Sequence, residues 1–103
     1  MMEKNDKHPA TLDEAVDILM EELSFGDRTI IANIREDDLR NLDFVFRNRI
    51  MFEFGLWNEN NDLLQSCRHK SDHSSLDPDM ASVFIIKRLW NTVHNTRVLK
   101  VVK

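Results

Sequence analysis

Hydrophobic residues recur at helical spacing along most of the chain, and they are densest within residues 39–57. At about 100° per residue, the apolar positions of this stretch form one broad stripe and two smaller clusters on other sides. Apolar groups on several sides need partners on several sides, so the pattern predicts a central helix surrounded by other helices. We therefore expect Trp57 to be buried against the last helix of the chain. The stripe consists of Leu39, Leu42, Phe46, Ile50, Phe54 and Trp57, and the smaller clusters consist of Val45 with Phe52 and of Phe44 with Met51.

The chain before this central helix predicts two shorter helices. Thr11 and Glu14 have the spacing of a capping box, in which both side chains accept hydrogen bonds from backbone amides of the first helical turn. Gly26 is a typical helix-ending residue, and Asp27 is a suitable N-cap for the second helix. The inward faces are expected to be formed by Leu12, Ala15, Val16, Leu19, Met20 and Leu23 in the first helix and by Ile30, Ile31 and Ile34 in the second.

Glycine and proline mark the boundaries of the later elements. Gly55 is expected to end the central helix in the left-handed conformation, with Leu56 folding back onto the last turn. Asp77 and Pro78 suit the N-cap and the first position of a last helix. The broad apolar arc of that helix consists of Val83, Phe84, Ile85, Ile86, Leu89, Trp90 and Val93.

The composition supports an all-α fold. Only two Gly and two Pro occur in 103 residues, which leaves few turns. We predict a compact bundle of about five helices around a central hydrophobic helix. Residues 11–95 are expected to form a single helical domain, with a disordered tail at residues 1–10 and a basic tail at residues 96–103.

The C-terminal tail has its own pattern. Asn95 and Thr96 interrupt the apolar periodicity, and the valines that follow favour an extended conformation. An extended segment leaves backbone groups unpaired, so two tails that pair about a two-fold axis would give a homodimer. A frayed, solvated terminus is the alternative. The predicted interaction residues are Arg97, Val98, Lys100 and Val101.

Metal-ligand side chains gather in one place. A short helix is predicted over residues 63–67, and the polar loop expected at residues 66–76 contains His69 and His73 close to Cys67. These residues lack the CxxC or HExxH spacing of a zinc site, so we predict no bound metal and no cofactor.

Candidate catalytic residues are equally scarce. Glu53 stands four residues after Arg49, and we interpret the two as a structural ion pair, because an arginine does not exchange its proton near neutral pH. No catalytic residues are predicted. The alternative of a small enzyme would depend on Glu53, His69, His73 and His94.

Charge is distributed unevenly along the chain. Residues 1–62 contain 15 acidic and 7 basic residues, whereas residues 63–103 contain 3 acidic and 7 basic residues. We expect these charges to pair helix faces within the domain, and a head-to-tail contact between copies is the alternative. The acidic residues at positions 36–38 disfavour a DNA-reading helix, since phosphates would repel them. A nucleic-acid-binding role would instead need one contiguous face formed by Lys87, Arg88, Arg97, Lys100 and Lys103.

The location of the protein is predicted from what the chain lacks. The first ten residues have no apolar signal-peptide core, and the longest apolar run, residues 83–86, is far shorter than the roughly 18 residues that cross a bilayer. A single cysteine cannot form an internal disulfide. We therefore expect a cytoplasmic protein without membrane contact.

Three stretches together resemble a small bacterial domain family of unknown function. They are Thr11-Leu-Asp-Glu-Ala-Val-Asp-Ile-Leu19, Glu53-Phe-Gly-Leu-Trp57, and Asp77-Pro-Asp79 with Ala81-Ser82 and Ile85-Ile86. The resemblance spans most of residues 11–90 and implies a helical domain of bacterial or phage origin, but no activity. We interpret the chain as a non-enzymatic protein-interaction module that binds a protein partner or a second copy of itself.

Overall fold

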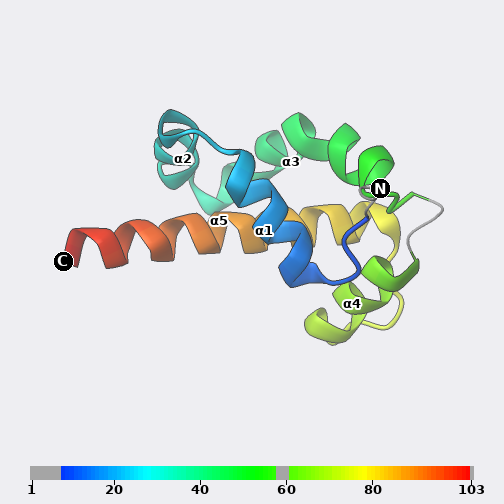
Figure 1. The fold of residues 1–103 in the computed structure, drawn as a ribbon. Helices are drawn as coiled ribbons and strands as arrows, with labels where there is room; N and C mark the ends of the chain where they lie inside the picture. Colours follow the sequence, from blue (N-terminus) through cyan, green and yellow to red (C-terminus); the bar gives the residue numbers. More distant parts are fainter. Residues whose placement is uncertain (1–7, 58–60, 103) are drawn as a thin grey trace, which may run out of the picture.

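The computed structural model describes residues 8–57 and 61–102, the side chains of residues 96–102 excepted. Five α-helices occur in these ranges (Figure 1). A 3₁₀ turn at Glu36–Asp38 leads into α3, and a π-helical segment at Arg49–Glu53 continues it. No strand occurs in the described ranges, so the all-α prediction is confirmed. The helices are α1 (Leu12–Glu22), α2 (Phe25–Ala32), α3 (Leu39–Asn48), α4 (Asn61–Ser71) and α5 (Pro78–Val102).

The helix at the centre of the bundle is α5, and not the stretch at residues 39–57 that the apolar pattern predicted. The other four helices all contact α5 (Figure 1). Its small Ala81 and Ser82 are fully buried and allow close approach of its neighbours, and the core side chains on it are Ile85, Ile86, Leu89 and Val93. By contrast, α3 buries one stripe and exposes Phe44 and Val45 to 80% and 71%. Apolar residues on several sides of a helix therefore did not imply neighbours on several sides.

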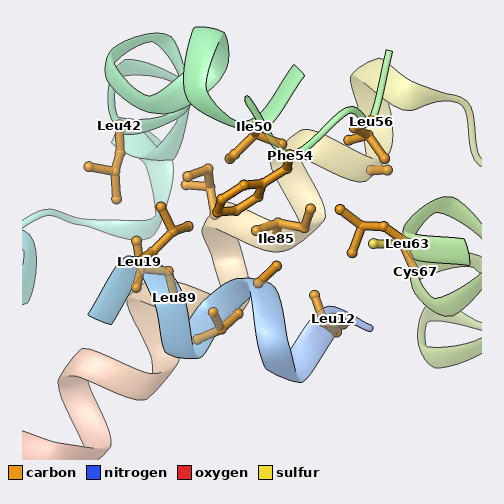
Figure 2. Packing of buried hydrophobic residues seen from close by; sticks show 14 of the residues in the cluster. Leu12, Leu19, Leu42, Ile50, Phe54, Leu56, Leu63, Cys67, Ile85 and Leu89 are labelled. Carbon is orange, nitrogen blue, oxygen red and sulfur yellow. The ribbon is translucent and has the colours of Figure 1, made fainter. Parts of the chain in front are cut away.

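The core forms where α1, α3 and α4 meet α5. Figure 2 shows Leu12 and Leu19 from α1 converging with Ile50 and Phe54 on Ile85 and Leu89 of α5, with Leu63 and Cys67 of α4 closing one end. The inward stripe predicted for the first helix is confirmed, with Met20 only partly buried. The contribution of α2 to this core is small, because Ile31 is its one buried residue.

The helix caps explain where α1 and α2 begin and end. The Thr11 hydroxyl accepts the Glu14 N–H at 3.1 Å, and the Glu14 carboxylate accepts the Ala10 N–H at 2.8 Å. The prediction that Gly26 ends this helix is wrong, because α1 ends at Glu22 and Gly26 lies in the first turn of α2. Ser24 caps α2 instead: its hydroxyl accepts the Asp27 N–H at 3.0 Å, and the Asp27 carboxylate accepts the Ser24 N–H at 3.2 Å. This reciprocal capping box satisfies two amides that Asp27 alone as N-cap would leave unpaired.

The turn that follows the π-helical segment has the predicted backbone conformation, but Trp57 is not buried as predicted. Gly55 adopts a left-handed φ of 76°, and the Leu56 N–H reaches back to the Ile50 carbonyl at 3.4 Å. Leu56 is buried, whereas Trp57 is 56% exposed. An uninterrupted α-helix would have placed Trp57 on the buried stripe, but the π-helical segment and the turn at Gly55 break that register. The predicted burial of Trp57 is therefore wrong.

The last two helices are both longer than the pattern suggested. The predicted loop from residue 66 is instead helical to Ser71, so Cys67 lies within α4. The Asp77 carboxylate accepts the Met80 N–H at 2.9 Å and Pro78 is the first residue of α5, as expected. The extended conformation expected for the C-terminal tail is not adopted by residues 96–102, which continue α5 as a helix. Extending an existing helix avoids a new nucleation step, and this outweighs the modest helical penalty of valine.

Candidate functional site

An apolar concavity lies between α2 and α3, and we call it the α2–α3 groove. Its volume is about 460 Å³. The apolar side chains come from the end of α1, from α2 and the residues after it, and from α3. They are Leu23, Ile30, Ile31, Ile34, Leu42, Val45 and Phe46, and the polar lining residues are Glu22, Asp27 and Asn41.

The groove has a buried floor and an exposed rim. Leu23, Ile31 and Leu42 on the floor belong to the hydrophobic core. Ile30 and Val45 on the two rims are 64% and 71% exposed. Large apolar side chains that remain exposed beside a concave apolar surface are typical of protein-binding sites.

Two hydrogen bonds to backbone carbonyls attach α2 and the segment after it to neighbouring helices. The Arg28 guanidinium donates to the Met20 carbonyl at 2.8 Å and attaches α2 to α1. At the other end, the Trp90 indole N–H donates to the Ile34 carbonyl at 2.7 Å and attaches the segment after α2 to α5. Because α2 is attached at Arg28 and the segment after it at Ile34, the chain itself forms the groove beside them before any partner binds.

The charges that line the groove are acidic. Glu22 forms an ion pair with Arg49, which also pairs with Glu53 at 3.0 Å and lies 5.6 Å from the centre of the Phe54 ring. Asp27 contributes to the cap of α2 and remains exposed. No basic residue is among the residues that line the groove. Arg49 balances the charge of Glu22, so Asp27 is the exposed carboxylate that would attract a positively charged partner.

A second group of apolar residues lies outside the groove. Phe25, Phe44 and Phe52 are all more than 60% exposed, and they lie on α2, on α3 and on the π-helical segment. Together with Ile30 and Val45, they are large apolar side chains that the fold leaves exposed on α2, α3 and the π-helical segment, whereas such residues are usually buried.

The predicted enzyme residues are not brought together as a set. His69 and His73 line a polar pocket of about 290 Å³ with Arg68 and Asp72. Both histidines are exposed. Glu53 instead pairs with Arg49, and His94 lies against Trp90 with ring centroids 4.5 Å apart. His69 and His73 therefore line the same pocket, whereas Glu53 and His94 have other neighbours.

Cys67 faces the core, whereas the two histidines face the solvent. Its side chain is fully buried in the core, and this burial raises the pKa of the thiol to about 12. A thiol with such a pKa stays protonated at neutral pH and is a poor nucleophile or metal ligand. Within the described ranges, no group of three or more His, Cys, Asp or Glu side chains is placed to hold a metal ion.

A known protein family matches most of the chain. The model of DUF6794, a domain of unknown function, matches residues 8–93. The chain belongs to this family. No match was found among curated proteins or among solved structures. The predicted resemblance to a small family of unknown function is thus confirmed, and residues 96–102 lie beyond the part of the DUF6794 chain that the match covers.

The DUF6794 domain contains one buried polar contact that sequence reasoning missed. The Ser82 hydroxyl donates to the Asp43 carboxylate at 2.6 Å, and both residues are buried. Arg47 lies 3.5 Å from Asp43, which is one turn before it on the same helix, and also pairs with Asp79. These contacts join α3 to the first turns of α5. The apolar pattern identifies Ser82 only as a small residue on the packed side of its helix, since no sequence signal marks its buried acceptor.

Two basic residues of α5 in the DUF6794 domain form ion pairs within the chain. Lys87 lies 3.0 Å from Glu36, and Arg88 lies 3.2 Å from Asp13. Both pairs join the basic half to the acidic half, as expected for pairing inside one domain. The predicted interaction residues Arg97, Val98, Lys100 and Val101 lie on the last turns of α5, and their side chains are outside the described part, as is Lys103. No helix in the described part is long and apolar enough to cross a bilayer.

Proposed function

We propose that this DUF6794 domain is a non-enzymatic protein-interaction module, and that its α2–α3 groove binds the apolar face of an amphipathic helix. The observation that carries the proposal is the combination of a buried floor at Ile31 and Leu42 with exposed apolar rims at Ile30 and Val45. A groove between two helices is a common binding site for a third helix, whose anchors recur at i, i+3, i+4 and i+7. Filling the groove would bury the rims together with the anchors of the partner.

The charged residues of the groove indicate which charge the partner helix should carry. Glu22 and Asp27 are the charged lining residues, so a helix with basic residues beside its apolar face would be favoured over an acidic one. We also propose a cytoplasmic location, which the free, buried thiol of Cys67 supports because structural disulfides are rare in reducing compartments. The bacterial origin implied by the sequence resemblance remains part of this proposal.

A synthetic helix that carries the required anchors and charges can test the proposal in place of the natural partner. The probe is a peptide of about 15 residues with leucines at i, i+3, i+4 and i+7 and lysines on its other face. We expect the full chain to bind it in a calorimetric titration, and Val45→Lys to weaken binding by about tenfold or more, because the substitution removes a rim contact and adds a repelling charge.

The matched control is Val83→Lys. Val83 is also an exposed valine on a helix, but it does not line the groove. We expect Val83→Lys to bind as the unmodified chain does. The proposal fails if the unmodified chain does not bind the peptide at a concentration at which the chain is monomeric, or if the two substitutions weaken binding equally.

A further inference from the structure

We propose that the helix that occupies the α2–α3 groove is the C-terminal end of α5 from a second copy of this chain. The inference rests on the proposed function of the groove, and it names the partner. The segment concerned is residues 96–102, which continue α5 as its last turns.

The first argument is the place of this segment in the fold. Figure 1 shows the end of α5 projecting past the bundle, with no other described element beside it. Seven residues at about 1.5 Å each make a projection of about 10 Å. A helical end of this length gains little stability from its own hydrogen bonds in water, so contact with another surface would stabilise it.

The second argument is the sequence of the segment. Residues 96–103 contain three basic residues and no acidic residue, whereas both charged residues that line the groove are acidic. Val98, Val101 and Val102 have the i, i+3, i+4 spacing of anchors that bind in helical grooves. The segment thus has the apolar spacing and the charge that the groove would select.

The third argument is that the contact must be between two chains. The Trp90 indole bonds the segment after α2 to α5, and α5 then continues without a break to Val102. Val98 is eight residues beyond Trp90, which corresponds to about 12 Å along the helix axis and away from this bond. An unbroken helix cannot fold back, so the end of α5 does not reach the groove of its own chain.

Reciprocal docking would give a closed dimer. Each chain has one groove and one projecting helix end, so a two-fold axis satisfies both sites at once and leaves none for further growth. The arrangement uses the predicted interaction residues Arg97, Val98, Lys100 and Val101, but as a helix in a groove and not as paired strands.

The test is the mass of the full-length chain in solution, measured by sedimentation velocity. We expect the unmodified chain and Val83→Lys to be dimers. Val45→Lys alters the groove, and the double substitution Val98→Lys with Val101→Lys alters the helix end, so each of these should sediment as a monomer. Circular dichroism establishes that both variants keep their helical content.

Mixing these two variants provides a sharper result. The Val45→Lys chain has an intact helix end, and the valine double variant has an intact groove. A pair of one chain of each kind can therefore form one of the two contacts, and it should be a heterodimer that is weaker than the unmodified dimer. The inference is overturned if the unmodified chain is monomeric at about 100 μM, a concentration well above a micromolar dissociation constant. A valine double variant that remains dimeric, or a mixture that does not associate, overturns it as well. A monomeric chain that still binds the leucine–lysine peptide would refute the second copy as partner and leave the proposed function intact.

Discussion

Two short helices, α4 and α2, pack beside the same central helix in different ways. Leu63 and Cys67 of α4 are completely buried between α1 and α5, so apolar contact holds this helix in place. Only Ile31 of α2 is buried, and its helix is held by the bonds that Arg28 and Trp90 make to backbone carbonyls. A helix that is attached by polar contacts can leave its apolar neighbours partly uncovered. The α2–α3 groove lies beside α2, the helix of the two that buries fewer residues.

The largest expected effect comes from matched truncations in the two helices. Leu63→Ala should lower the free energy of unfolding by about 3 kcal/mol, because a fully enclosed side chain leaves a cavity behind. Ile31→Ala should cost only about 1–2 kcal/mol, because its space opens into the groove and no closed cavity forms. Urea denaturation of both variants measures the two losses. Equal losses would show that α2 is packed as tightly as α4.

A smaller effect is expected when the attachment of α2 to α5 is removed. Trp90→Phe keeps an aromatic ring beside His94 but removes the indole N–H that bonds to the Ile34 carbonyl. The cost should be about 1 kcal/mol. Hydrogen exchange should accelerate in α2 and remain unchanged in α4, since the lost bond concerns α2 alone. Faster exchange in both helices would mean that Trp90 acts through the whole core.

An effect of similar size is expected from the titration of the Cys67 thiol, which lies in α4. Burial raises the pKa of this thiol from 9.0 to about 12, so the protonated form is favoured in the folded state. The resulting stability is complete below pH 9.0 and is lost as the pH rises towards 12. Between about pH 8 and about pH 10, the unmodified chain should lose about 1 kcal/mol more stability than Cys67→Ala, which has no thiol to titrate.

Urea denaturation at the two pH values measures this difference. The variant is the control for lysines and other groups that titrate in the same range. Parallel losses in the two proteins would mean that the Cys67 thiol is not desolvated in the folded chain.

The elements of the fold could be predicted where a local signal determines them. The Thr11 cap, the start of α5 at Asp77 and Pro78, and the turn at Gly55 each depend on residues within one helical turn. The boundary between α1 and α2 was missed because Gly26 is a common stop signal, whereas the capping box of Ser24 and Asp27 decided it. The helical end of α5 was missed because the propensity of valine takes no account of the helix that precedes it.

The candidate groove could not be predicted, because periodicity does not show which apolar positions are covered. Leu42 and Val45 are both apolar residues of α3, yet one lies on the floor of the groove and the other on its exposed rim. The difference depends on where α2 lies, and backbone carbonyls at Met20 and Ile34 determine that position. Carbonyl acceptors are present at every residue, so the side-chain pattern cannot identify these two.

The buried contact between Asp43 and Ser82 restricts how α3 can slide along α5. A shift of one helical turn would move the Asp43 carboxylate by about 5.4 Å and separate it from its donor. Leucines and isoleucines on the same two helices would accept such a shift with little loss, since apolar contacts are not directional. The Asp43 carboxylate would lose the Ser82 hydroxyl while keeping Arg47 of its own helix, and the loss of a hydrogen bond at a buried carboxylate is costly. One serine hydroxyl thus selects a single alignment from several that hydrophobic packing alone would allow.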